Sequence, residues 1–214
     1  MKTPIPKAVV NRLPLYLRRL EYLAAGGTET ISSRELAESL GRKDAQVRKD
    51  FACFGNFGRP GVGYPVAELI TKLRGILGTD HLWRVALVGF GNLGRALVAY
   101  KGFQKRAFKI QAVFDADPAK VGRRAGDLVV QSAAEMVPEI RRLGIPMAIL
   151  AVPAEVAQAA ADRCVEAGVV GILNFAPVTL DLPGHVAVNH VDLTLCMEQL
   201  SFLASTLSRR AAGP

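Results

Sequence analysis

The segment RVALVGFGNLGRALVAY, residues 84–100, constrains the fold of this chain more than any other. A run of strand-forming apolar residues breaks into Gly89-Phe90-Gly91-Asn92-Leu93-Gly94 and then resumes at helical spacing. In a strand–turn–helix unit of this kind, the first glycine permits a tight turn, the second lets the backbone approach a pyrophosphate, and the third allows the helix to pack closely on the strand. The helix N-terminus then faces the phosphates. We therefore predict a dinucleotide-binding unit.

Strand-like and helix-like segments alternate after this unit. We expect strands at 109–115, 146–153 and 171–177, with a helix at 154–168. Such alternation predicts an α/β fold with a Rossmann-like parallel sheet that is covered by helices.

An acidic residue, Asp115, ends the second strand, 21 residues after Gly94. A carboxylate at this place accepts hydrogen bonds from the adenosine ribose and repels a 2′-phosphate, which favours NAD over NADP. Lys120, Arg123 and Arg124 follow closely, and they either weaken this preference or are solvated charges.

Two further strand ends should line the same crevice, because the carboxyl ends of parallel strands meet at one edge of the sheet. They are the ends of the expected strands 146–153 and 171–177. Asn174, in the second of these strands, either bonds the nicotinamide amide or caps its own loop. The residues predicted to bind NADH or NAD+ are Gly89, Phe90, Gly91, Asn92, Leu93, Gly94, Asp115, Val152, Pro153, Asn174, Phe175, Ala176 and Pro177.

The first eighty residues have a helical pattern. An amphipathic helix is expected over 7–27, where Gly26-Gly27 stops it and Pro14 either kinks it or marks its start. A short helix follows, with Ser32 and Glu35 at capping-box spacing. The next helix has Asp44 as its expected N-cap, with Val47, Phe51 and Phe54 turned inward and Gln46, Arg48 and Lys49 outward.

Two short helices joined by a turn form either a helix-turn-helix or an ordinary helical hairpin with a charged face. The glycine-rich segment 55–64, GNFGRPGVGY, favours the first, because Phe57, Val62 and Tyr64 are available for a hairpin with Arg59 at its tip, like the wing of a winged helix. A plain glycine-rich loop is the alternative. A helix closing near Gly78 completes this domain. The predicted DNA-binding residues are Lys43, Gln46, Arg48, Lys49, Arg59 and Gly61.

The net charge of +8 is concentrated towards the N-terminus: residues 1–80 contribute +5 and residues 81–214 contribute +3. This balance is consistent with a nucleic-acid partner. The absence of a long apolar run or a signal peptide predicts a cytoplasmic protein without membrane contact. Cys53, Cys164 and Cys196 lack metal-ligand or redox-pair spacing, so we expect reduced core residues.

The sequence does not favour catalysis. The strands and helices above use nearly all of the last 130 or so residues, which leaves no substrate domain. His81, His185 and His190 form no catalytic or metal-binding pattern with Cys164 or the acidic residues. We therefore expect no catalytic residue and no metal, and a pocket that senses its ligand.

Several motifs in order resemble the redox-sensing transcriptional repressor Rex family over nearly the whole chain: QVRKDFACFG, GRPGVGY, VGFGNLGRAL, FDADPAKVG, NFAPV and VNHVDLT. The resemblance implies a homodimer that binds a palindromic double-stranded DNA operator when NADH is scarce and releases it when NADH binds. It also implies a C-terminal helix that is exchanged between subunits. Residues 193–208 match this helix, although by periodicity they could pack on their own subunit.

The resemblance further implies a switch, in which Asp192 pairs with Arg18 in the DNA-binding form and with Tyr100 in the NADH form. The alternatives are a solvated charge for Arg18, a core position for Tyr100 and a helix N-cap for Asp192. Leu193 stands where the family often has an aromatic residue, so the contact with the nicotinamide is expected to be weaker, or to come from Phe175 or the partner.

The predicted organisation is a winged-helix DNA-binding domain at 1–80, a Rossmann NAD(H)-binding domain at 81–191, and a C-terminal helix and tail for dimerisation at 192–214. Two alternatives remain at this point. One is an NAD-dependent oxidoreductase whose N-terminal helices mediate oligomerisation, and the other is a regulator whose glycine turn holds coenzyme A.

Overall fold

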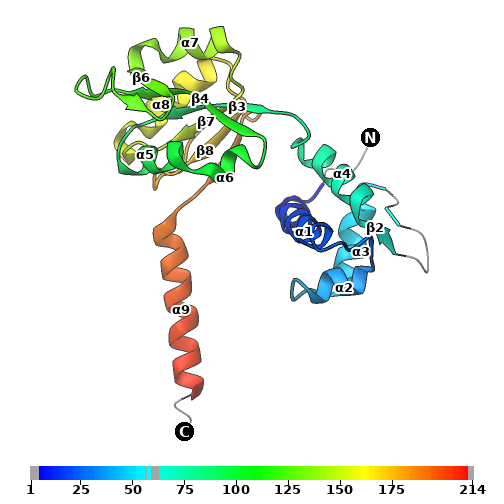
Figure 1. Cartoon of the computed structure of the whole chain (residues 1–214). Helices are drawn as coiled ribbons and strands as arrows, with labels where there is room; N and C mark the ends of the chain where they lie inside the picture. The colour runs from blue at the N-terminus through cyan, green and yellow to red at the C-terminus, as the bar shows by residue number, and fades with distance from the viewer. Residues whose placement is uncertain (1–4, 56, 59–62, 212–214) are drawn as a thin grey trace. The chain divides into compact units, whose positions relative to one another are not determined.

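The computed structural model describes residues 5–55, 57–58 and 63–211. The chain divides into two compact units, Met1–His81 and Leu82–Pro214 (Figure 1). The predicted positions Arg59, Gly61 and Val62 lie outside the described residues.

The first unit is mostly helical. Its elements are α1 (Lys7–Ala25), β1 (Thr30–Ile31), α2 (Ser33–Glu38), α3 (Asp44–Ala52), β2 (Tyr64–Pro65) and α4 (Val66–Leu77). Pro14 lies within α1 and does not mark its start. The capping box predicted for Ser32 and Glu35 is confirmed, with both of its hydrogen bonds present.

Tyr64 pairs with Ile31 of β1 and Phe57 is buried, whereas the hairpin predicted over 55–64 includes positions that lie outside the described residues. Two details of this unit differ from the prediction. Lys43 is the N-cap of α3, and Asp44 is the first helical residue, where its carboxylate accepts from the Ala45 amide and complements the helix dipole. Gln46 and Phe54 are both half-buried, so Gln46 does not simply face outward.

A buried carboxylate lies inside this unit. Asp50 of α3 is fully buried, and it accepts hydrogen bonds from Arg12 Nε at 2.6 Å and from Tyr16 Oη at 2.7 Å, both on α1. Burial alone would raise the pKa of Asp50, but bonds from Arg12, Tyr16 and Gln46 outweigh it and hold the pKa below its usual value. Burial and the bond to Asp50 raise the pKa of Tyr16 to about 12.

The second unit is a seven-stranded sheet in the order β5-β6-β4-β3-β7-β8-β9. Its strands are β3 (Trp83–Val88), β4 (Phe108–Asp115), β5 (Arg124–Ala125), β6 (Leu128–Ser132), β7 (Met147–Leu150), β8 (Gly171–Asn174) and β9 (Ala187–His190). All neighbouring strands are parallel except β5 and β6. From β6 to β9 this is the strand order of a Rossmann sheet, so the predicted fold class is confirmed.

Helices cover both faces of this sheet (Figure 1). The helices α7 (Met136–Leu143) and α8 (Ala154–Glu166) pack on the face that carries Val88 and Phe114. The helices α5 (Asn92–Ala99) and α6 (Lys101–Gln104) pack on the opposite face, which carries Leu87 and Val113. Successive strand residues therefore alternate between two cores. Neither α7 nor the short 3₁₀ turn η1 (Ala133–Glu135) before it was predicted from the sequence.

The last helix, α9 (Leu193–Ala211), exposes its apolar side chains. Leu193, Leu195, Met197, Leu200, Phe202, Leu203 and Leu207 are each more than half exposed. The prediction that all three cysteines are core residues is wrong. Only Cys164 is buried, whereas Cys53 follows α3 on the surface and Cys196 lies on exposed α9. Within the described ranges, no helix has both the length and the apolar character that a membrane span requires.

We expect Asp50→Ala to lower the free energy of unfolding by about 3 kcal/mol, because Arg12 is left without its partner charge. Urea titration of the full chain, followed by circular dichroism, measures this loss. The folded-state pKa of Asp50 lies below its usual 3.8, so its contribution is complete above that pH and is lost as the pH falls through the folded-state value. A variant whose stability equals the wild type at pH 7 would contradict the assignment.

Candidate functional site

The glycine turn lies where the strand order of the sheet reverses, between β3 and β7. Ligands of open α/β sheets bind at this crevice. Gly89 follows β3 with φ +99°, a left-handed conformation that favours glycine, and a Cβ there would lie 2.3 Å from the Ala151 carbonyl oxygen after β7. The two strand ends therefore leave no room for a side chain at Gly89.

The other two glycines of the turn have different surroundings. A Cβ on Gly94 would lie 2.0 Å from the Gly89 carbonyl oxygen, so this glycine lets α5 pack on the turn. A Cβ on Gly91 would meet nothing within 4 Å. No side chain caps the N-terminus of α5 at Gly91. Free space beside uncapped helical amides fits a pyrophosphate group.

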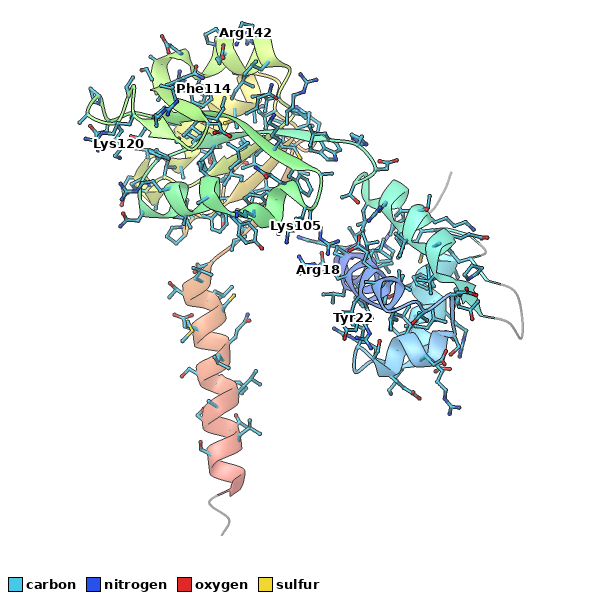
Figure 2. The ribbon with its side chains drawn as sticks, in the orientation of Figure 1. Arg18, Tyr22, Lys105, Phe114, Lys120 and Arg142 are labelled. Atoms are coloured by element: carbon cyan, nitrogen blue, oxygen red, sulfur yellow. The ribbon has the colours of Figure 1, made fainter. Side chains whose placement is uncertain are left out.

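Asp115, at the end of β4, is tied to this turn. Its carboxylate accepts from the Phe90 amide at 2.7 Å and from the Asp117 amide at 2.9 Å, and it lies 3.2 Å from Lys120 Nζ. Burial would raise the pKa of Asp115, but the backbone bonds and Lys120 lower it overall. The group is therefore an ionised acceptor, and Lys120 (Figure 2) is its partner, not an isolated solvated charge.

The loop after β8 is held by Asn174, which is fully buried. Its Nδ2 donates to the carbonyls of Ala176 and Val178 at 3.1 and 2.9 Å, and its Oδ1 accepts from the Ala176 amide at 3.0 Å. Of the two alternatives for this side chain, the structure has the loop cap. Phe175 is half-buried and Pro177 exposed beside it.

The three residues of the expected switch are placed as follows. Asp192 Oδ1 accepts from the amides of Thr194 and Leu195 at 2.8 and 3.1 Å, so it caps α9. Tyr100 is 58 % exposed, which rules out the core alternative, and its ring meets Phe103 edge-on. Arg18 is exposed on α1 (Figure 2).

Four of the residues predicted to meet DNA, Lys43, Gln46, Arg48 and Lys49, lie on α3 or at its N-cap. Lys49 is exposed. Arg48 bonds Asp44 at 2.6 Å and Ser33 at 3.2 Å, an arrangement that holds its guanidinium on the surface between α2 and α3. Gln46 instead donates to Asp50 at 2.7 Å. Lys43, Arg48 and Lys49 thus place three cations around the first two turns of this helix.

The cysteines and histidines of the described ranges have separate surroundings. No group of three His, Cys, Asp or Glu side chains there is arranged to hold a metal ion. Burial raises the pKa of the Cys164 thiol to about 12, so it is a thiol and a poor nucleophile at neutral pH. His81 is bonded to its neighbour Asp80 at 2.8 Å.

A unit with a helix-turn-helix pair, joined to a Rossmann unit with an open phosphate cradle, defines a class of ligand-responsive DNA-binding regulators. Comparisons with known proteins agree. Residues 4–52 match the family described as "Putative DNA-binding protein N-terminus", and residues 80–178 match "CoA binding domain".

The similarity to complete proteins covers almost the whole chain. The chain is 45% identical over 197 residues to the "Redox-sensing transcriptional repressor Rex" of Chloroflexus aurantiacus, which covers 92% of this chain and 93% of that protein. Structures of RSP superimpose with TM-scores of 0.92, in complex with NAD+ and operator DNA, and 0.88, in complex with NADH. They are 37% and 36% identical and cover 99% of each chain. This chain therefore belongs to the Rex family of redox-sensing transcriptional repressors.

We expect the glycines of the turn to differ in their effect on folding. Gly94→Ala should lower the free energy of unfolding by about 2–3 kcal/mol or more, because its Cβ collides with a backbone carbonyl. Gly91→Ala is the matched control and should change it by less than about 1 kcal/mol, since its Cβ enters open space at φ −80°. Equal losses in urea titrations of the two variants would contradict this division.

Proposed function

We propose that this protein is a DNA-binding transcriptional repressor that releases its operator when NADH binds. The observation that carries the proposal is the open, uncapped cradle at Gly91, in a unit joined to a helix-turn-helix. The likeness to RSP over 99% of the chain supports it, because RSP was solved with NAD+ and operator DNA and also with NADH.

The proposed pocket distinguishes two oxidation states by charge. The nicotinamide ring of NAD+ is a cation, whereas that of NADH is neutral, and an unpaired cation is costly to bury beside apolar groups such as Phe175 and Val152. Only a difference in affinity between two protein states shifts their balance. A nearly complete switch needs a difference of roughly 5 kcal/mol.

The proposed nucleotide contacts divide among three parts of the site. Residues 89–94 hold the pyrophosphate, Asp115 with Lys120 lies at the adenosine ribose, and the strand ends 152–153 and 174–177 surround the nicotinamide. Asn174 contributes by shaping its loop, since its amide is already bonded there. Asp115 favours NADH over NADPH, because its charge repels a 2′-phosphate.

We propose a homodimer on a palindromic operator. Two recognition helices, here α3, reach half-sites about one turn of DNA apart. The exposed apolar side chains of α9 are a suitable surface for a second copy of the chain. In this scheme residues 1–80 bind DNA, 81–191 bind NAD(H) and 192–214 dimerise, with Arg18, Tyr100 and Asp192 as the switch between states.

We further propose that the protein is not an enzyme and that it acts in the cytoplasm. The names of its relatives as repressors support the first point. Coenzyme A is a second candidate ligand, favoured by the match of residues 80–178. Calorimetric titration with NADH and with coenzyme A decides between them, and turnover of small carbonyl substrates with NADH would support an oxidoreductase instead.

Fluorescence anisotropy on a labelled operator tests the redox response. We expect NADH to release the DNA at lower concentration than NAD+ or NADPH. Gly91→Asp should abolish this response and leave DNA binding intact, because it sets a carboxylate against the pyrophosphate. Gly91→Ala is its uncharged control. Equal release by all three nucleotides would rule out redox sensing.

Lys49→Ala tests the DNA contact. Loss of one phosphate contact should weaken binding and reduce the slope of log affinity against log salt by about 1. Lys109→Ala removes an exposed charge from β4 and should leave the slope unchanged. If both variants change the slope alike, α3 is not the contact surface. NADH binding, followed by its fluorescence, should be unaffected in both.

A further inference from the structure

The carboxylate of Asp50 is saturated with hydrogen bonds. Arg12 donates through Nε and Nη2 at 2.6 and 2.8 Å, Tyr16 Oη donates at 2.7 Å, and Gln46 Nε2 donates at 2.7 Å. Arg12 and Tyr16 lie on α1, and Gln46 lies one turn before Asp50 on α3. The side chain of Asp50 has no exposed surface. The four bonds match the four lone-pair sites of an ionised carboxylate.

The bond from Gln46 fixes which way its amide faces. An ionised carboxylate only accepts hydrogen bonds, so the NH₂ group of Gln46, and not its oxygen, must face Asp50. Within the described part of the chain, no donor bonds the Gln46 carbonyl oxygen, and the residue remains partly exposed on α3 near Arg48 and Lys49. The amide therefore offers the outside an acceptor and one remaining N–H.

We propose that Asp50 is a positioning residue for operator recognition, which turns the Gln46 carbonyl oxygen towards the DNA and thereby selects adenine at one position of each half-site. The inference rests on the proposed function. In the major groove, adenine offers an N6 amino donor beside the N7 acceptor, which matches the acceptor and the spare N–H of this amide. Guanine offers two acceptors at the same edge and does not match.

Arg12 and Tyr16 have a different task in this arrangement. They hold the Asp50 carboxylate from α1, so that its charge is compensated and its direction is set independently of Gln46. Tyr16 can therefore lose its hydroxyl without releasing the amide of Gln46. Removal of the Tyr16 hydroxyl therefore changes the stability of the cluster but not its preference for a base.

The test is selection and sequencing of DNA. A library of duplexes with two inverted, randomised half-sites is enriched with the full-length wild type and, separately, with three variants. The wild type should enrich adenine at one position of the half-site. Gln46→Met should reduce that preference by roughly 10-fold or more, the usual value of a bidentate base contact, while the other positions keep theirs.

Asp50→Asn carries the main prediction. Its amide can donate to the Gln46 oxygen, so Gln46 can turn over and present its NH₂ group, and the adenine preference should fall by a similar factor in favour of bases that offer acceptors. Tyr16→Phe is the matched control, because it removes one bond to Asp50 and keeps that of Gln46, and it should retain the preference. Thermal unfolding and NADH binding show that each variant is folded.

Three results would overturn the proposal: an unchanged adenine preference in Gln46→Met, an unchanged preference in a folded Asp50→Asn, or its loss in Tyr16→Phe. If Asp50→Asn does not fold, the contrast between Gln46→Met and Tyr16→Phe decides. A wild type that enriches no sequence would contradict the proposed function itself. A wild type that enriches a motif which Gln46→Met leaves unchanged would contradict only this inference.

Discussion

The close approach of the glycine turn to the end of β7 governs the nucleotide unit. Gly89 has a left-handed conformation that residues with a Cβ rarely adopt, and a Cβ there would collide with the Ala151 carbonyl. Gly94 then packs α5 on the same turn, and Phe90 is tied to Asp115 on the neighbouring strand. Three strands and one helix end are thus held around the free space at Gly91.

Among the described residues, each unit has one buried carboxylate, and that carboxylate accepts a hydrogen bond from a group near the surface. Asp115 is compensated by Lys120 and holds the backbone of the glycine turn. Asp50 is compensated by Arg12 and holds the amide of Gln46. Removing either partner would leave a buried charge unpaired, which costs more than the pair contributes. The glycine turn and the Gln46 amide are therefore positioned by directional bonds as well as by apolar packing.

Local signals in the sequence predicted the glycine turn, the capping box at Ser32 and the alternation that leads to the parallel sheet, because each depends on neighbouring residues. The signals failed where partners are distant in the chain. Arg12 and Asp50 are 38 residues apart, and Tyr64 pairs with Ile31 across α2 and α3. Hydrophobic spacing also cannot tell a cysteine on exposed α9 from one in α8, since exposure depends on what covers the helix. Asp44 failed as an N-cap by one residue, the ordinary uncertainty of a helix boundary.

In the proposed function, NADH and operator DNA favour different states of one protein. Linkage then requires that operator DNA weaken NADH binding by the same factor by which NADH weakens operator binding. The direct measurement is calorimetric titration of NADH, and of NAD+, into free protein and into protein saturated with operator. We expect weaker NADH binding to the complex, by the factor seen in DNA release, and a smaller effect for NAD+. Equal NADH affinity with and without operator would show that the two ligands do not favour different states of the protein.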